Sequence, residues 1–545
     1  MNNSASSGAG ATRKIPVLIV GAGPVGLALA GELGWRGVAC ELVEQSDGAI
    51  ATPKMNEVNI RTMEFCRRWG IADAVRNSPF PPDHPLDVVF VTSLGGYELA
   101  RMRRPPRGQE PAGGSSPERH QVCSQLWFDP ILRSFAQAQP AVALRYRTRL
   151  ESFASDGQGV IAELHDLDTG RRETIAADYL VGCDGATSAI RETLGIELKG
   201  KGILGYPLHL YFSTPDLLAR CGREPGVFFL AIDRHGLWAN IRVIDPANGL
   251  WRLMALDSDG KQTPESVDRA GLVRRAIGRP IEVEWKGLSI WTRKSVVAER
   301  YGQGRVFLAG DAVHQLSPTG ALGMNTGIGD AVDLGWKLAA VLQGWGGENL
   351  LASYDAERRP IGLRNVRMAT AFYLAHGEFA EDMAAIEDET DAGRALRARL
   401  SESLTKNVGR MFRTAGLQLG YRYESSPICL ADGVPPPDDP ETYIASAQAG
   451  CRAPHAALRD GRSILDLFGR GFVLLRFAEA ATGALEAAAA ARGLPLAVID
   501  LDEPDAAAAY ERPLVLVRPD GHVAWRGDAL PGDVAGLIDR VRGAI

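Results

Sequence analysis

The chain has 545 residues, of which 45% are hydrophobic and 23% charged, which is typical of a globular protein of about two to four domains. Its formal net charge of -6 argues against a protein that binds nucleic acid or an anionic membrane through its overall charge. No apolar run reaches the roughly 18 residues that a membrane helix needs. Seven scattered cysteines without a C-x-x-C pattern predict reduced thiols, a cytoplasmic location and no metal site.

The N-terminal segment ends in a pattern typical of dinucleotide binding. Residues 1–14 are predicted to be a disordered tail, because the first eleven are rich in Asn, Ser, Gly and Ala and have no signal-peptide pattern. A strand over 15–20 then leads into a G-x-G-x-x-G turn, a helix to about 35 and a second strand that ends at an acid. We expect these cofactor contacts: Gly21, Gly23, Pro24, Val25, Gly26, Glu44 and Gln45. Glutamate at the strand end favours an adenosine 2′-OH over a 2′-phosphate.

Two further polar residues of the first domain are candidates for the cofactor site. Lys54 lies in the loop before a helix over 56–70 and could reach a phosphate or the ring edge of a dinucleotide cofactor, or be a surface lysine. Gln125 opens the next helix, where its amide could bond the cofactor or only cap the helix. Residues 79–117 are rich in Pro, Gly and Arg and predict an excursion from this domain, with one short strand near 87–92.

Two later strands end in carboxylates. An apolar strand runs into Asp184, and a buried strand over 306–309 runs into Asp311, followed by a Pro/Gly turn and a helix after Gly323. With Glu44, three strand ends would bring an acid to one site. A helix that starts on this turn would aim its positive end at a bound group. The pattern therefore predicts a dinucleotide cofactor at this place.

These motifs together resemble the single-component, FAD-dependent aromatic hydroxylases, the class A flavoprotein monooxygenases of the para-hydroxybenzoate hydroxylase and phenol-hydroxylase type. The residues that carry the resemblance are G-A-G-P-V-G with Glu44, G-C-D-G-A-T-S-A-I-R, and G-R-V-F-L-A-G-D-A-V-H with P-T-G-A-L-G-M-N. The resemblance implies that Asp184 serves FAD and NAD(P)H and that Asp311 holds the ribityl chain. It also implies backbone contacts from Gly323, Met324 and Asn325 to the flavin ring and from Pro318 to the substrate. Lys54 stands where the family more often has arginine.

The resemblance and the patterns imply an α/β fold: a Rossmann-like FAD-binding domain, an inserted β-sheet substrate domain and a C-terminal thioredoxin-like domain. We expect the FAD-binding domain at 15–198 and 292–375, the substrate sheet at 199–291, a helical connection at 376–426, and the thioredoxin-like domain at 427–545. This last domain lacks C-x-x-C, so we expect a structural or dimerisation role and not thiol exchange.

Two strands of the predicted substrate sheet form a hairpin through D-R-H-G, at 226–232 and 237–243. One face would place Phe229 and Ala231 opposite Trp238 and Asn240, an apolar wall with one polar group that suits a planar ring. A shift of one residue inverts this face, and the same residues could be plain sheet core. His235, in the turn, is the nearby imidazole that could deprotonate a phenol.

The resemblance implies that NAD(P)H, as NADPH or NADH, reduces FAD, that O2 adds at flavin C4a, and that the hydroperoxide hydroxylates a phenolic or polyketide-derived aromatic. Two alternatives remain: Baeyer–Villiger or epoxidation chemistry on the same fold, and a non-catalytic flavoprotein that binds a ligand or partner. The expected partner is a small aromatic substrate, with a homodimer as a further possibility.

Overall fold

The computed structural model describes residues 13–107, 109, 114–256, 260–375 and 382–545. Strand β1 begins at Arg13, which pairs with Ile175, so Arg13 and Lys14 belong to the sheet and not to the predicted tail. The rest of that tail, residues 1–12, lies outside the described residues.

A mixed sheet at the centre of the molecule carries the first strand–turn–helix motif. Its strands run in the order β18-β19-β10-β1-β2-β7, and β8 and β9 extend from β10 as an antiparallel hairpin. The four strands from β19 to β2 are parallel neighbours, so their carboxyl ends meet at one edge. The strands are β1 (Arg13–Val20), β2 (Cys40–Val43), β7 (Val142–Arg145), β8 (Thr148–Ser155), β9 (Val160–Asp166), β10 (Arg172–Gly182), β18 (Gly302–Gln303) and β19 (Val306–Leu308).

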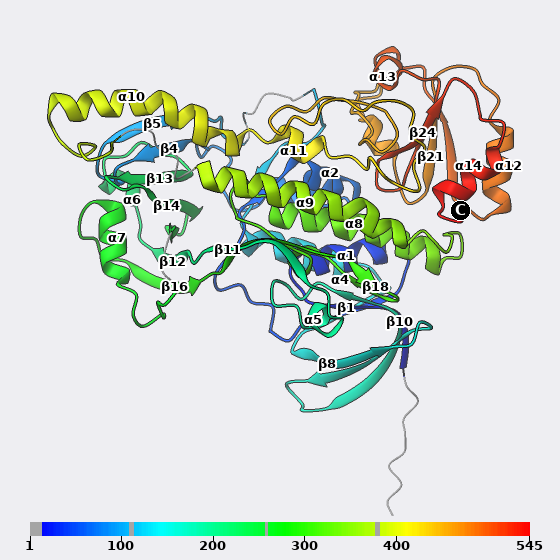
Figure 1. Ribbon diagram of the computed structural model, residues 1–545, viewed down its shortest axis with the longest axis horizontal. Helices are drawn as coiled ribbons and strands as arrows, with labels where there is room; N and C mark the ends of the chain where they lie inside the picture. The colour runs from blue at the N-terminus through cyan, green and yellow to red at the C-terminus, as the bar shows by residue number, and fades with distance from the viewer. Residues whose placement is uncertain (1–12, 108, 110–113, 257–259, 376–381) are drawn as a thin grey trace, which may run out of the picture.

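Helices cover this sheet, and the long pair α8 and α9 runs side by side across the middle of the molecule (Figure 1). Helix α8 packs against α1 in the core that includes the buried face of the sheet. The helices of this domain are α1 (Pro24–Trp35), α2 (Ile60–Arg68), α3 (Ala72–Arg76), α4 (Gln125–Gln137), α5 (Ala189–Thr193), α8 (Gly323–Leu342) and α9 (Ala352–Leu374). A small ribbon pairs β3 (Glu57–Val58) with β6 (Gln121–Val122), and a three-stranded sheet joins β11 (Leu198–Gly205), β17 (Arg293–Ala298) and β20 (His314–Gln315).

The second sheet has seven strands in the order β16-β12-β15-β14-β13-β4-β5, at the left of Figure 1. It contains the predicted hairpin, now β13 and β14. Two of its strands, β4 and β5, come from the segment predicted as an excursion of the first domain, so the substrate sheet extends beyond residues 199–291. The elements are β4 (Val88–Val91), β5 (Glu98–Met102), β12 (Leu208–Ser213), β13 (Phe228–Asp233), β14 (Gly236–Asp245), β15 (Leu250–Ala255), β16 (Glu284–Ile290), α6 (Leu217–Arg220) and α7 (Arg269–Ile277).

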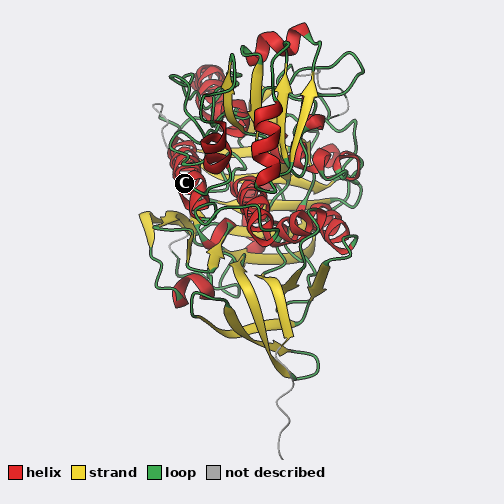
Figure 2. Ribbon diagram, turned by 90° about the vertical axis from the view of Figure 1, so that its right-hand side faces the viewer, coloured by secondary structure: helices red, strands yellow, loops and turns green. Residues whose placement is uncertain are grey.

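Helices α10 (Asp391–Asn407) and α11 (Ala415–Leu419) connect this part to a C-terminal α/β domain. Its sheet, in the order β22-β21-β23-β24, combines a parallel βαβ unit with an antiparallel hairpin and a last helix. This is the thioredoxin-like arrangement that the sequence predicted; in Figure 1 it lies at the opposite end of the molecule from the seven-stranded sheet, and in Figure 2 that end faces the viewer. The elements are β21 (Phe472–Arg476), α12 (Gly483–Ala491), β22 (Leu496–Asp500), α13 (Pro504–Tyr510), β23 (Leu514–Val517), β24 (Val523–Gly527) and α14 (Val534–Val541).

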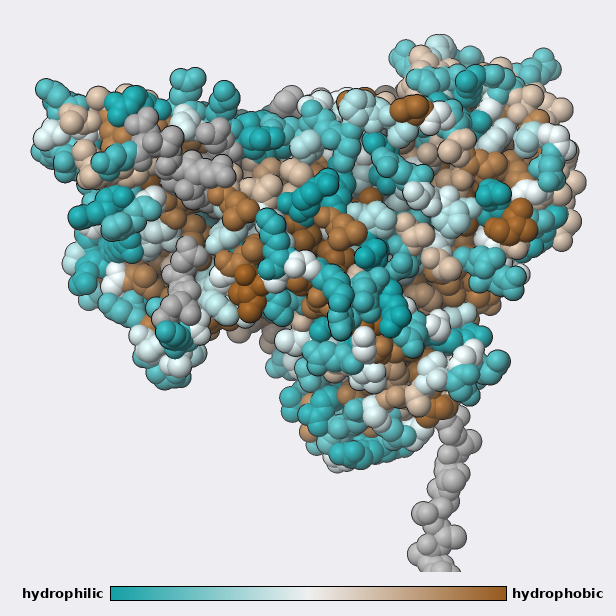
Figure 3. Space-filling view, in the orientation of Figure 1, coloured by the Kyte–Doolittle hydropathy of each residue, from teal (hydrophilic) through white to brown (hydrophobic). Residues whose placement is uncertain are grey.

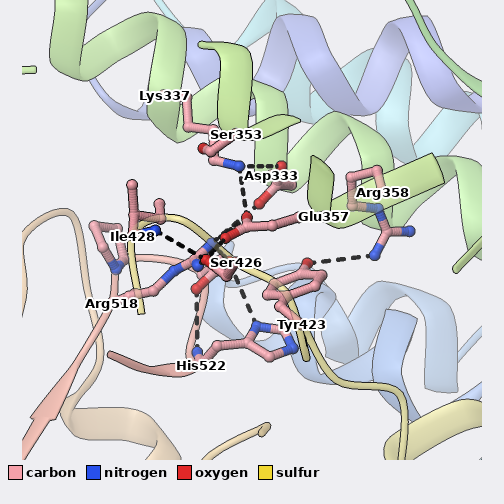
Figure 4. Close-up of polar contacts among 12 residues, drawn as sticks. Asp333, Lys337, Ser353, Glu357, Arg358, Tyr423, Ser426, Ile428, Arg518 and His522 are labelled. Atoms are coloured by element: carbon pink, nitrogen blue, oxygen red, sulfur yellow. Dashed lines mark hydrogen bonds and ion pairs between the residues drawn. The ribbon is translucent and has the colours of Figure 1, made fainter. Parts of the chain in front are cut away.

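A buried ion network attaches the C-terminal domain to α8 and α9 (Figure 4). Arg518, after β23, forms a bidentate pair with Glu357 of α9 at 2.6 and 2.8 Å and also contacts Asp333 of α8 at 3.2 Å. Lys337 contacts both of these carboxylates, at 2.6 and 2.7 Å. Beside Arg518, the ring of His522 packs against that of Tyr423 at a centroid distance of 4.3 Å, with the two planes tilted by 33°. Charged groups of α8 and α9 and of the C-terminal domain are thus held in one buried cluster.

This cluster predicts acid sensitivity. Burial lowers the pKa of His522 to about 4, against the opposing pull of Asp520, so the unfolded chain binds this proton first as the pH falls. The contribution of neutral His522 to the free energy of unfolding is therefore fully present above about pH 6.5. About 3 kcal/mol of it is lost as the pH falls from about 6.5 to 4. Thermal unfolding of the holoenzyme from about pH 7 to 4 should show a smaller loss of Tm for His522→Asn than for the native chain. Plots of Tm against pH that run parallel for the two proteins would contradict this role of His522.

Candidate functional site

The carboxyl edge of the central sheet gathers the acids that the sequence singled out. Glu44 follows β2, Asp184 follows β10 and Asp311 follows β19, while the glycine turn follows β1, which lies between β2 and β10. Because these strands are parallel neighbours, the three carboxylates line one edge beside the turn.

The glycine turn is tight on one side and open on the other. Gly21 has φ +107°, and a Cβ on it would lie 2.4 Å from the carbonyl oxygen of Cys183. A Cβ on Gly26 would lie 1.9 Å from the carbonyl oxygen of Gly21, so only glycine lets α1 approach the strand. Gly23, by contrast, has no heavy atom within 4 Å of its Cβ position. Pro24 and Val25 follow it as the first residues of α1. Backbone amides here are accessible to a pyrophosphate at the positive end of a helix.

The acids at this edge are arranged to accept hydrogen bonds. Glu44 receives the backbone N–H of Ala22 at 2.9 Å through one oxygen and that of Ser46 at 2.8 Å through the other, and Gln45, next to it, is exposed. Asp184 receives the N–H of Ile190 at 3.2 Å through Oδ2, while its buried Oδ1 has no hydrogen-bond partner among the residues that the structure describes. Asp311 is exposed. An orphaned buried carboxylate oxygen and two accessible acids beside an open glycine turn fit a polyhydroxylated dinucleotide such as FAD.

Lys54 and Gln125 contact each other. The amide oxygen of Gln125 accepts the backbone N–H of Lys54 at 2.8 Å, and its amide nitrogen donates to Asp129 at 2.9 Å. Gln125 therefore holds the loop that carries Lys54, whose side chain is exposed. Burial raises the pKa of Asp129 to about 7.

Helix α8 starts at Gly323, as predicted, and its first turn is tied to a distant strand. The side chain of Asn325 accepts the N–H of Asn59 at 3.0 Å and donates to the carbonyl oxygens of Glu57 and Ala321. Because the side chain of Asn325 is fully used in these hydrogen bonds, a ligand could contact only the backbone of Asn325 and of half-buried Met324. Pro318 and the following turn face a cavity.

That cavity, about 430 Å³ in volume, lies between the start of α8 and the seven-stranded sheet. Apolar residues gather over the same central part of the molecule in Figure 3. From the sheet come Phe228, Leu230, Asn240, Arg242, Arg252, Met254 and Leu256; the other lining residues are Glu57, Asn59, Ile60, Arg104, His120, Arg293, Pro318, Thr319, Gly320, Ala321, Leu322, Met411, Phe412, Arg413, Thr414, Ala415, Gln418 and Glu441. Its size suits a fused-ring ligand.

The predicted substrate wall is one residue out of register on β13. Phe228 and Leu230 line the cavity, whereas Phe229 and Ala231 point to the other face, because neighbouring residues of a strand alternate. Asn240 pairs with Leu230 and does line the cavity. Trp238 lies two residues nearer the hairpin turn and does not, and Arg275 covers its ring at 3.8 Å.

The structure also places His235 away from the cavity. It is exposed in the β13–β14 turn, and its backbone N–H donates to Asp233 at 2.8 Å. It is absent from the cavity lining, so it is not positioned as a base. The sequence missed the arginines of this site. Arg242 and Arg252 interrupt otherwise apolar strands, and a charged residue at such a position is the signal that could have revealed them.

The open glycine turn, the three acids and the adjoining cavity define an FAD-binding oxidoreductase with a site for an organic substrate. Comparisons with known proteins agree. The FAD binding domain family matches residues 14–369, and the family described as aromatic-ring hydroxylase, C-terminal, matches residues 446–544. The chain belongs to the FAD-dependent aromatic-ring hydroxylases; it is a flavoprotein monooxygenase, and enzymes of this family use NAD(P)H and O2.

Relatives match over nearly the whole chain. The FAD-dependent monooxygenase apdD of Emericella nidulans is 35% identical, covering 94% of this chain and 88% of its own length. The 4-methyl-5-nitrocatechol 5-monooxygenase of Burkholderia sp is 34% identical, covering 98% of each chain. The chromopyrrolic acid-soaked structure of RebC with bound 7-carboxy-K252c is 40% identical, with a TM-score of 0.91 over 98% of this chain and 100% of RebC. Among the residues that the structure describes, no helix is long and apolar enough to cross a membrane.

Proposed function

We propose that this monooxygenase hydroxylates a planar, fused-ring phenolic or polyketide-derived aromatic that carries a carboxylate, and that the cavity beside α8 holds this substrate. The observation that supports the proposal is the charge of the cavity wall. Five arginines but only two glutamates line it, so positive charge is in excess by three. The similar protein RebC was solved with bound 7-carboxy-K252c, and the carboxyl group in that name supports the carboxylate of the proposed substrate.

The arginines of the sheet have few protein acceptors. Arg242 is buried and one of its guanidinium nitrogens contacts Glu57, but among the described residues its Nε has no partner, and burial, with neighbouring Arg252, lowers its pKa to about 9. Arg252 is 6% exposed, and its Nε likewise lacks a hydrogen-bond partner. Burial lowers its pKa, which nearby Tyr211 raises in part. A buried guanidinium is costly without an anion, and a carboxylate is its best-matched planar partner. Phe228, Leu230 and Met254 supply an apolar surface for the rings.

The cofactor would be held at the sheet edge by the glycine turn, Glu44, Asp184 and Asp311, with its ring toward Gly323 and Met324. When bound, FAD supplies the reductive activation of O2. The residues of the chain bind and orient the substrate against Pro318, and the walls of the cavity exclude water. The amino end of α8 favours negative charge at its first turn.

A matched pair of phenols tests the proposal. With 7-hydroxycoumarin-3-carboxylate and 7-hydroxycoumarin as probes, we expect the acid to bind more tightly to the holoenzyme and to stimulate NAD(P)H oxidation. Arg252→Met should weaken binding of the acid by roughly ten- to a hundredfold and leave that of 7-hydroxycoumarin nearly unchanged. Dissociation constants come from fluorescence titration, and mass spectrometry identifies the product.

The control is Arg275→Met, which removes an arginine that stacks on Trp238 outside the cavity. It should leave both affinities unchanged. If the native enzyme bound the two probes with equal affinity, the proposal that the substrate carries a carboxylate would be wrong. A product with an oxygen inserted into a ring, in place of a new hydroxyl group, would favour Baeyer–Villiger chemistry.

We also propose a cytoplasmic location, which all seven cysteines support by being unpaired thiols. A homodimer is retained as a proposal, as are the four domain boundaries near residues 198, 291, 375 and 426.

A further inference from the structure

The side-chain amide of Asn240 in the cavity wall has no hydrogen-bond partner among the residues that the structure describes. Asn240 belongs to β14, lines the cavity and is 3% exposed. Its Oδ1 atom is enclosed by the protein, whereas Nδ2 is not enclosed in this way and donates to no described group. Because Asn240 is part of the cavity lining, Nδ2 is the polar atom of this side chain that a ligand can reach.

The neighbours of Asn240 in the sheet offer its amide no good acceptor. Asn240 pairs with Leu230 on β13 and with Met254 on β15. Leucine has no polar side-chain atom, and the sulfur of methionine accepts only weakly. The next residue on the same face of β14 is Arg242, whose guanidinium is a donor only. The acceptor for Nδ2 must therefore come from the cavity.

Stability by itself does not favour an asparagine at this position. An enclosed amide without a partner lowers the stability of the folded chain, and an apolar side chain of similar size, such as leucine, would not. The amide also lies next to the arginines proposed to bind a carboxylate. Arg242 is two residues along the same strand, roughly 7 Å away, and Arg252 pairs with Arg242. Asn240 is thus placed to contact the same ligand as these arginines.

We propose that Asn240 is a specificity-determining residue that donates from Nδ2 to a ring carbonyl oxygen of the substrate, as in a quinone, lactone or lactam. The inference rests on the proposed function of the cavity and adds a second group to its substrate, beside the carboxylate at Arg242 and Arg252. A carbonyl oxygen only accepts, so it is complementary to Nδ2. A hydroxyl group fits less well, because its proton would need an acceptor that Leu230, Met254 and Arg242 do not offer.

The test uses the oxidised holoenzyme and two acids that differ only in the ring carbonyl. These are 7-hydroxycoumarin-3-carboxylate and 7-hydroxy-2H-chromene-3-carboxylate, in which a CH2 group replaces the carbonyl. We expect the native enzyme to bind the coumarin roughly tenfold more tightly, because one hydrogen bond in an enclosed site has an effect of this size. With Asn240→Leu, the two dissociation constants from isothermal titration calorimetry should agree within about twofold, and the chromene should bind as it does to the native enzyme.

Thermal unfolding separates this role from a structural one. Asn240→Leu should have a Tm at least as high as that of the native enzyme, because it removes an amide without a partner. An amide that held the sheet together would give a lower Tm. Asn240→Ala is a second variant, which removes the amide without adding volume and should lose the preference for the carbonyl in the same way.

The control is Asn248→Leu, in the turn between β14 and β15 outside the cavity. The Nδ2 atom of Asn248 donates to Asp245 at 2.7 Å, so this amide already has its acceptor in the protein. Asn248→Leu should keep the roughly tenfold preference for the coumarin.

The inference is overturned if the native enzyme binds the two acids equally, or if Asn240→Leu and Asn240→Ala keep the preference. It is also overturned if these variants weaken the binding of both acids alike, because Asn240 would then hold the carboxylate or the sheet. The pair 7-hydroxycoumarin and 7-hydroxy-2H-chromene tests the carbonyl without the carboxylate. A preference for the carbonyl in both pairs, with no gain from the carboxylate, would refute the proposed carboxylate and support the role of Asn240.

Discussion

Asp311→Ala is expected to be isolated largely without FAD. Asp311 is exposed shortly after β19, at the edge that also carries Glu44 and Asp184. Loss of a charged acceptor for cofactor hydroxyls should weaken FAD binding on the order of ten- to a hundredfold. The ratio of flavin to protein absorbance after gel filtration measures the effect.

The fold around Asp311 should survive this change. Behind the loop, buried Asp330 accepts the N–H of Gly310 at 3.1 Å, contacts His314 at 2.8 Å and pairs with Arg358 at 2.9 Å. Asp502→Ala, which removes an aspartate of a surface pair with Arg459, is the matched control and should keep its FAD. A folded Asp311→Ala protein with a full complement of FAD would contradict the assignment.

Arg518→Met is expected to lower the free energy of unfolding by about 3 to 5 kcal/mol. Arg518 is fully buried and contacts three carboxylates, those of Glu357, Asp333 and Asp520. Without it, Lys337 remains as the cation that contacts Glu357 and Asp333. The cost arises because the carboxylates would stay buried with too few partners, and not because an ion pair is intrinsically stabilising. The midpoint of thermal unfolding of the holoenzyme, with limited proteolysis to detect release of the C-terminal domain, checks this.

Arg512→Met provides the comparison. Arg512 is 45% exposed and pairs with Asp528 at 2.8 Å, so its loss should cost less than about 1 kcal/mol. Similar melting midpoints for Arg512→Met and Arg518→Met would refute a central role for the buried cluster. Early proteolytic release of the C-terminal domain from Arg518→Met alone would show that the cluster attaches that domain to α8 and α9.

The FAD-binding half could be predicted from the sequence because its signals are local. A strand, its glycine turn and the helix after it are continuous in the chain, and the clash that requires Gly26 lies within that unit, whereas the one at Gly21 is with Cys183 at the end of a neighbouring strand. Parallel strands then bring Glu44, Asp184 and Asp311 to one edge by a general rule of α/β sheets. The hairpin of β13 and β14 was equally local.

The lining of the cavity could not be predicted from local signals, because its residues come from segments far apart in the chain. The choice between Phe228 and Phe229 depends on which face of β13 meets the cavity, and a period of two is the same for both faces. Nothing near His120 in the sequence indicates Glu57, since their pairing depends on β3 meeting β6. The sequence alone therefore determined the family, the cofactor and the edge that binds it. Tertiary packing decided which arginines, which strand face and which histidine line the cavity.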